Sequence, residues 1–241
     1  MDVYWLEQTT ADLPDHDDWL SAAEAARSSA MRFAKRRADW RLGRWTAKNA
    51  VAAHLHLHSL ATIEILAAPS GAPEAFVAGE PAPVTISLSH RGGRAVCAVA
   101  AAGVLLGCDL EIVEARSEAF ATDYFTAEEQ ALVARAPVSD RPRMLALLWS
   151  GKESVLKALR TGLRLDTRSV SVDPVGALLP AIEETWHPLH GRYAGQDFPG
   201  WWQQTADVVR TMVAVPAPVP PHYVRLHLAE NSVSISGTLV F

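Results

Sequence analysis

Cysteine is scarce in this chain of 241 residues, which contains only Cys97 and Cys108. Two cysteines are too few for a disulfide framework or an all-cysteine zinc site. Both lie in apolar segments, so we expect them to be small buried side chains. Gly and Pro, at 14 and 15 residues, are also too few for a collagen-like or disordered chain. The composition is that of one large domain or two smaller ones.

Long hydrophobic runs are absent as well. The apolar stretch without a charge in the middle of the chain covers residues 95–108, which is 14 residues. A helix needs about 20 apolar residues to cross a bilayer. The first residues are acidic and lack the basic start and apolar segment of a secretory signal. We therefore expect a cytoplasmic protein without a membrane partner.

An excess of positive charge is missing too, because 22 Lys and Arg face 27 Asp and Glu, giving a net charge of −5. This balance argues against a protein that coats nucleic acid. Bases are nevertheless concentrated in one segment. From Glu24 to Lys48, eight bases and two acids give a local charge of +6. Such a cluster needs a specific explanation.

Hydrophobic periodicity predicts helices followed by strands in both halves of the chain. The expected helices cover residues 19–35, 39–57, 126–135 and 139–160. The expected strands cover residues 62–66, 84–88, 94–101, 104–109, 168–172, 208–215, 223–227 and 232–240. Asp17 or Asp18 is a plausible N-cap of the first helix, and Thr126-Ala127-Glu128-Glu129 is a capping box. The halves share this order of elements, but no sequence repeat between them is evident.

Acidic residues occur at two places where they could act together. Asp109 and Glu111 end an apolar strand two residues apart, so both carboxylates lie on one face. Glu153 and Lys157 lie four residues apart on an otherwise apolar helix. A solvated strand end and an ordinary helix ion pair would explain them separately. A helix carboxylate facing the first two acids would instead give the all-oxygen environment that Mg²⁺ selects.

The sequence has two groups of histidines that could bind an ion. His90 follows Ser89 at a strand end, before a Gly-rich turn with free backbone donors, so an anion contact and a plain surface histidine are both open. His54, His56 and His58 lie near a predicted helix end and lack a third ligand at helical spacing. We expect no metal at these three.

The order of a basic helix, SLSH, GCDLE and WSGKESVLK resembles the Sfp-type 4'-phosphopantetheinyl transferase superfamily. That family shows a (V/I)G(V/I)D-x-E strand followed by (F/W)-(S/C)-x-K-E-(A/S)-h-h-K. Here the two motifs are Leu106-Gly107-Cys108-Asp109-Leu110-Glu111 and Trp149-Ser150-Gly151-Lys152-Glu153-Ser154-Val155-Leu156-Lys157. The likeness extends more loosely from about residue 32 to residue 173. Many members have a lysine where this chain has Ala72, which places one phosphate or adenine contact in doubt.

The resemblance implies a role for each matching residue. The metal ligands would be Asp109, Glu111 and Glu153, holding Mg²⁺, or Mn²⁺ in its place, on the pyrophosphate of coenzyme A. The catalytic set would be Glu153, Lys157 and Asp109, with Glu153 taking the proton of the acceptor serine and Lys157 contacting the reacting phosphate. The coenzyme A contacts would be Arg36, Arg44, Ser89, His90 and Lys157, with Arg37 and Lys48 as helpers.

The resemblance also implies an activity and a fold. The enzyme would transfer the 4'-phosphopantetheine group of coenzyme A to a serine hydroxyl of an apo acyl or peptidyl carrier protein, releasing 3',5'-ADP. The fold would be α/β (α+β), with two similar α+β halves in a pseudo-twofold arrangement and a site between them, in a monomer. Residues 1–102 would contain the basic helix, and residues 103–241 the metal-binding carboxylates.

Several alternatives stay open at this point. A Mg²⁺-dependent phosphodiesterase could use the same three carboxylates, and a non-catalytic protein could bind coenzyme A or a carrier. Four classes of carrier stay open: those of fatty-acid, polyketide, nonribosomal-peptide and lysine-pathway proteins. Phe120, Tyr124 and Phe125 are expected either to form an apolar surface for the carrier or to pack in the core.

Overall fold

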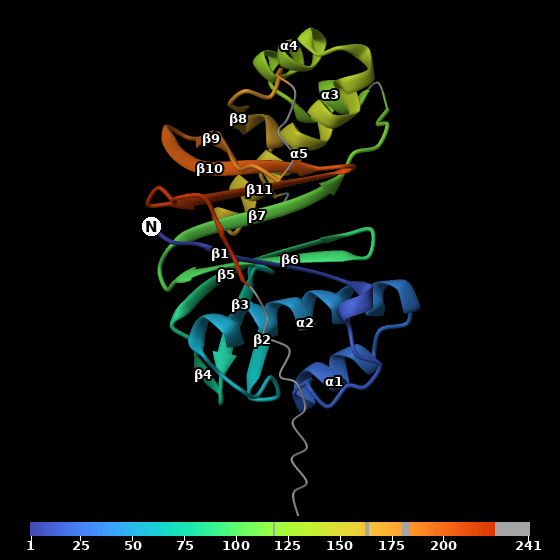
Figure 1. Ribbon diagram of the computed structural model, residues 1–241, viewed down its shortest axis with the longest axis vertical. Helices are drawn as coiled ribbons and strands as arrows, with labels where there is room; N and C mark the ends of the chain where they lie inside the picture. Colours follow the sequence, from blue (N-terminus) through green and yellow to red (C-terminus); the bar gives the residue numbers. More distant parts are fainter. Residues whose placement is uncertain (118, 162–163, 180–183, 225–241) are drawn as a thin grey trace, which may run out of the picture.

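Two sheets packed face to face form the centre of the structure, and one long helix covers the outer face of each (Figure 1). The computed structural model describes residues 1–117, 119–161, 164–179 and 184–224. The predicted mixed α+β class is confirmed. No helix in these ranges is both long and apolar enough to cross a membrane.

The first half of the chain contains six strands and a short helix, which surround the long helix α2 (Ala34–Leu55). The strands are β1 (Tyr4–Thr9), β2 (Ile63–Ala67), β3 (Pro73–Val77), β4 (Glu80–Pro81), β5 (Val84–Arg91) and β6 (Arg94–Ala101). The helices are α1 (Ala22–Ser29) and α2 (Ala34–Leu55). One sheet has the order β12-β1-β6-β5, and a small sheet has the order β2-β3-β4. Helix α2 packs across β1, β5 and β6.

The second half repeats this arrangement of a helix on a sheet. Its strands are β7 (Leu105–Ile112), β8 (Val170–Pro174), β9 (His187–Tyr193), β10 (Gln196–Thr205) and β11 (Val208–Val215), in the order β7-β11-β10-β9-β8. Its helices are α3 (Ala119–Tyr124), α4 (Ala127–Arg135) and α5 (Arg141–Ala158). Short 3₁₀ turns lie at Thr10–Asp12, Val138–Asp140 and Thr167–Ser169.

The boundary expected between residues 102 and 103 falls in the turn from β6 to β7. The chain does not stay in its second half after β11, however. It returns to the first sheet, where β12 (His222–Tyr223) pairs in parallel with β1. The chain order alone therefore does not define the two structural halves.

Alternation of side chains along the strands builds the layers. In β6, Val96 and Ala98 face the second sheet, whereas Cys97 and Val99 face α2. Cys108 on β7 lies in the core between the sheets. Both cysteines are free and buried, as predicted.

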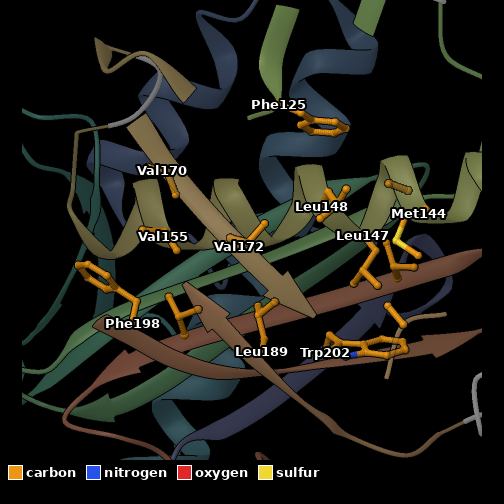
Figure 2. Close-up of a cluster of buried hydrophobic side chains, with 14 of the residues drawn as sticks. Phe125, Met144, Leu147, Leu148, Val155, Val170, Val172, Leu189, Phe198 and Trp202 are labelled. Atoms are coloured by element: carbon orange, nitrogen blue, oxygen red, sulfur yellow. The ribbon is translucent and has the colours of Figure 1, made fainter. Parts of the chain in front are cut away.

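Helix α5 is the centre of the largest core cluster (Figure 2). Met144, Leu147, Leu148 and Val155 of this helix pack against side chains of β8, β9 and β10. These strand residues are Val170, Val172, Leu189, Phe198 and Trp202. Since a buried aliphatic or aromatic side chain contributes about 1.5–3 kcal/mol, this cluster fixes the helix on its sheet.

The opposite side of α5 lies unusually close to β7. A Cβ atom at Gly107 would lie 1.8 Å from the backbone oxygen of Ser154 and 2.7 Å from the nitrogen of Ala158. Only glycine allows this approach. It brings the helix that contains Glu153 and Lys157 directly onto the strand that contains Asp109.

Most predicted elements exist, but the first helix is wrong. The range 19–35 contains all of α1 but only the first two residues of α2. Ser21 and Glu24 make a capping box that starts α1, and α2 begins at Ala34, before the expected start at residue 39. Asp17, a proposed N-cap, instead binds Arg41 at 2.6 Å. Thr126 caps α4 and the strand at 94–101 is confirmed.

Several strands were not predicted. They are β1, β3, β4, β9 and β10. The expected strand at 223–227 lies partly outside the described residues, and the one at 232–240 lies wholly outside them. Strands β9 and β10 contain Pro188, Pro199 and Gly200, which interrupt the pattern that sequence reading depends on.

Candidate functional site

A pocket of about 750 Å³ lies where the two halves meet; we call it the central pocket. Its wall includes α2, the β2–β3 turn, β5, the β6–β7 turn and the end of α5. From the first half, Trp40, Arg44 and His90 line it, and Lys157 and Arg160 line it from the second. Its size is in the range of sites for small ligands and cofactors.

Lys157 connects this pocket with the carboxylates of β7. Its Nζ donates to Oδ1 of Asp109 at 2.7 Å and to the backbone oxygen of Cys108 at 3.1 Å. Burial is the largest single influence and acts to lower the pKa of Lys157. The charge and hydrogen bond of Asp109, together with the charges of Cys108 and Glu153, outweigh burial and raise this pKa above its ordinary value. The lysine therefore stays a cation on the pocket wall.

Asp109 is buried and only half satisfied. Its Oδ1 accepts from Lys157 and from the hydroxyl of Ser89 at 2.7 Å. Its Oδ2 is buried without a hydrogen-bond partner among the described residues. An orphaned carboxylate oxygen of this kind is unfavourable unless a cation or donor reaches it.

Glu111 and Glu153 lie in the same electrostatic environment. Burial, followed by repulsion from Asp109, raises the pKa of each. Glu111 is held by Arg116 at 3.0 Å and by Arg91 at 3.7 Å. Crowded acids with raised pKa values favour the approach of a cation.

These three acids are near one another without forming a ready coordination shell. Within the described ranges, no three His, Cys, Asp or Glu side chains are already grouped closely enough to hold a metal ion. Arginines hold Glu111 at present, so Glu111 would exchange them for the ion. The donor set and the orphaned oxygen of Asp109 nevertheless fit Mg²⁺, which prefers carboxylate oxygens and water.

Arg44 supplies positive charge on the other side of the central pocket. Its guanidinium lies 4.9 Å from the ring of Trp40. Desolvation by burial lowers the pKa of Arg44 to about 10 despite the opposing charge of Glu24. Its Nε is buried and has no hydrogen-bond partner in the described part of the chain. A phosphate oxygen would satisfy this donor.

A second, shallower pocket of about 470 Å³, which we call the side pocket, adjoins the first at Trp40 and His90. Phe33, Lys35, Arg36 and Asp39 complete its wall. The structure thus places the predicted Arg36 beside His90. Arg37 is exposed, and it is outside the described lining of both pockets.

Two predicted coenzyme A contacts need correction. Lys48 is fully buried; its Nζ lies 2.5 Å from Glu24 and donates to the backbone oxygens of Trp19 and Leu60. It cannot reach a ligand in either pocket. Ser89 uses its hydroxyl on Asp109, so it orients that carboxylate instead of lining the pocket.

The expected carrier surface at residues 120–125 also changes. Phe125 is 1% exposed and belongs to the core, so the core interpretation is correct for it. Phe120 and Tyr124 pack edge-on against Trp149, with ring centroids at 5.5 and 5.1 Å. Tyr124 remains 38% exposed.

Sequence reasoning missed Arg91 and Arg116 on Glu111, and Arg160 in the central pocket. Arg160 also binds Glu74 at 2.6 Å, which joins the second half to the first across the pocket. The contacts of Arg91 and Arg160 join residues that are distant in sequence, and Arg116 lies in a segment without a periodic pattern. The one available signal was that two acids two residues apart need nearby bases.

Comparison with known proteins adds two findings. Residues 105–206 match the family described as the 4'-phosphopantetheinyl transferase superfamily, and this range contains Asp109, Glu111, Glu153 and Lys157. Among solved structures, the chain is similar to Helicobacter pylori holo-[acyl-carrier-protein] synthase (AcpS) in complex with coenzyme A, at 16% identity. That match covers 42% of this chain and 99% of the other, with a TM-score of 0.34. No curated protein matches by sequence.

Proposed function

The chain belongs, through residues 105–206, to the 4'-phosphopantetheinyl transferase superfamily of enzymes, and from this premise we propose its reaction and its site. It transfers the 4'-phosphopantetheine group of coenzyme A to a serine hydroxyl of an apo acyl or peptidyl carrier protein. The other product is 3',5'-ADP. The observation that carries the proposal is the place of Lys157, which lines the central pocket and lies 2.7 Å from Asp109.

Coenzyme A has phosphate charge at two separate places, and the site offers separate groups for each. Arg44, His90 and Arg36 lie in the walls of the two adjoining pockets and would bind the 3'-phosphoadenosine end. Arginine suits this task because its planar guanidinium donates to two phosphate oxygens at once. Lys157 would meet the pyrophosphate. The lysine that many relatives have at position 72 is Ala72 here, so Arg44 has the larger share of this binding.

Asp109, Glu111 and Glu153 would hold Mg²⁺ or Mn²⁺, which when bound offsets the negative charge of the pyrophosphate oxygens. Ser89 and Lys157 orient Asp109 through its Oδ1 and leave its buried Oδ2 free. Arg116 and Arg91 hold Glu111 near the site and partly offset the rise of its pKa.

The chemical step is a displacement at the phosphorus that bears pantetheine. The serine oxygen forms a new bond to this phosphorus, and the bond from phosphorus to the oxygen of 3',5'-ADP breaks. Glu153 accepts the serine proton, because burial and the charge of Asp109 raise its pKa toward the range of an effective base. Lys157 donates to phosphate oxygens on which charge increases.

We further propose that the two halves are pseudo-twofold equivalents in a monomer. Support comes from the order of elements: β1, α1, α2, β2, β3, β5 and β6 correspond to β7, α4, α5, β8, β9, β10 and β11. The sheet neighbours correspond as well, since β1-β6-β5 parallels β7-β11-β10. Coenzyme A would then lie between the basic helix α2 of the first half and the carboxylates of the second half.

Intact-protein mass spectrometry tests the activity. An apo carrier protein is incubated with this protein, coenzyme A and Mg²⁺, with EDTA and a carrier whose acceptor serine is alanine as controls. A phosphopantetheine adduct that needs both metal and serine is expected. Release of 3',5'-ADP from coenzyme A without any adduct on several carriers would contradict the proposal and favour a phosphodiesterase. Binding of coenzyme A without either product would favour a non-catalytic binder.

A further inference from the structure

A buried ion pair joins three segments of the first half. Glu24 is the third residue of α1, and its Oε2 accepts from the backbone nitrogen of Ser21 at 3.0 Å. Its Oε1 accepts from the backbone nitrogen of Ile65 on β2 at 3.0 Å. Lys48 of α2 is 0% exposed and lies 2.5 Å from Oε2 of Glu24, while its Nζ also donates to two backbone oxygens. The pair therefore ties α2 to α1 and β2.

The second half contains the same set of contacts. Glu129 is the third residue of α4, and its Oε2 accepts from the backbone nitrogen of Thr126 at 2.8 Å. Its Oε1 accepts from the nitrogen of Val172 on β8 at 2.9 Å. Lys152 of α5 is 0% exposed, lies 2.8 Å from Oε2 of Glu129, and donates to the backbone oxygens of Thr167 and Val170.

The surroundings of the two pairs correspond as well. Trp45 packs edge-on against Trp19 with centroids 5.1 Å apart, and Trp149 packs edge-on against Tyr124 at the same 5.1 Å. Aligned on the two lysines, WTAKNAVAAHL (residues 45–55) and WSGKESVLKAL (residues 149–159) share Trp, Lys, Val and Leu. The absence of an evident repeat, stated from the sequence, is thus corrected: a repeat is visible once the buried contacts give the alignment.

Helices α2 and α5 differ on the faces that are turned to the central pocket and to Asp109. Where α5 has Glu153 and Lys157, the alignment gives α2 Asn49 and Ala53. Helix α2 instead presents Arg44 to the central pocket, one turn before Lys48. Each buried pair therefore supports a helix with a different chemical task.

We propose that Lys48 and Lys152 are positioning residues with separable effects: the Glu24–Lys48 pair sets α2 so that Arg44 meets the nucleotide end of coenzyme A, and the Glu129–Lys152 pair sets α5 so that Glu153 and Lys157 meet Asp109. This inference rests on the proposed function for its two ligands. Its physical basis is that a buried ammonium with three fixed acceptors permits one helix position and penalises the others.

The test compares Lys48→Met with Lys152→Met, each serving as the matched control of the other. Isothermal titration calorimetry measures binding of 3',5'-ADP, and electron paramagnetic resonance measures binding of Mn²⁺. Lys48→Met is expected to weaken 3',5'-ADP binding about tenfold or more and to leave Mn²⁺ binding within about twofold. Lys152→Met is expected to do the reverse, because loss of outer contacts to a metal site weakens metal binding about 10- to 100-fold.

A second pair of variants keeps the test valid if a single change prevents folding. Glu24→Gln/Lys48→Met and Glu129→Gln/Lys152→Met remove both charges, which is less destabilising than leaving one of them buried alone. Persistence of the selective binding defects in folded double variants supports positioning. The positioning proposal is overturned if the double variants recover both wild-type stability and wild-type binding. It is also overturned if both variants lose binding of 3',5'-ADP and of Mn²⁺ equally.

The wild-type protein separates this inference from the proposed function. If it binds both 3',5'-ADP and Mn²⁺ and the variants show the selective defects, but no carrier is modified, the transferase proposal fails and the positioning roles stand. If it binds neither ligand, both proposals are overturned.

Discussion

The long helices α2 and α5 have nearly the same buried surroundings and very different ligand-facing side chains. Each is held by a lysine that is fully buried against a glutamate of a capping box, and each has a tryptophan one turn earlier. Helix α2 offers Arg44 to the central pocket, whereas α5 offers Lys157 and lies beside two strand carboxylates. The comparison teaches that the buried contacts specify where a helix lies, and a few outward residues specify its chemistry.

The largest effect is expected from Glu153→Gln, which removes the proposed base and metal ligand. Transfer should fall by about 100-fold or more. Because burial and repulsion from Asp109 raise the pKa of Glu153, its removal should leave the melting temperature unchanged or higher. Adduct formation by mass spectrometry and a thermal melt measure the two quantities. The matched control is Asn49→Ala, at the corresponding position of α2, which should transfer at close to the wild-type rate.

A large drop in melting temperature for Glu153→Gln would mean that this acid is structural. So would a wild-type rate of transfer. Either result would contradict the claim that Glu153 gives α5 a chemical role that α2 lacks.

The next effect concerns the contact of α5 with β7. Gly107→Ala places a methyl group 1.8 Å from the backbone oxygen of Ser154, so the helix must move away from Asp109. Overpacking of this kind destabilises a protein by about 1–3 kcal/mol. Chemical denaturation should show this loss, and transfer should fall with it.

Gly151→Ala is the control for that variant. Its added methyl would lie 3.4 Å from Val172, an ordinary contact, and α2 has Ala47 at the corresponding position. It should be tolerated in both assays. Equal damage from the two variants would show that the close approach at Gly107 has no special role.

A smaller and more specific effect is expected from Arg44→Met. Loss of the half-buried guanidinium should raise the KM for coenzyme A about tenfold while kcat changes little, because in our proposal Arg44 binds the non-reacting end of the substrate. Initial rates at several coenzyme A concentrations separate the two constants. A fall in kcat with unchanged KM would instead place Arg44 at the reacting phosphate.

The smallest effect is expected from Arg36→Ala. Arg36 is exposed in the wall of the side pocket, where solvent and salt weaken a contact to phosphate. The KM for coenzyme A should rise only about two- to threefold at physiological salt, and the difference should shrink at higher salt. An effect as large as that of Arg44→Met would reverse the order of the two arginines.

How much of this could be predicted from the sequence depended on whether the signal was local. The capping box at Thr126, the strand at 94–101 and the two acidic motifs are local patterns, and sequence reasoning identified them. The contacts of Lys48 are not local. Because Lys48 lies in a basic segment, the sequence predicts an exposed cation. Only the fold brings Glu24 and two backbone oxygens around it. The role of Ser89 was likewise set by the packing of β5 beside β7.

The most direct test of the division between the halves is the anomalous scattering of Mn²⁺ in crystals grown with coenzyme A. We expect a Mn²⁺ peak beside Oδ2 of Asp109, with the nucleotide in the central pocket against Arg44 and His90. A peak away from Asp109, or a nucleotide bound outside that pocket, would contradict the account.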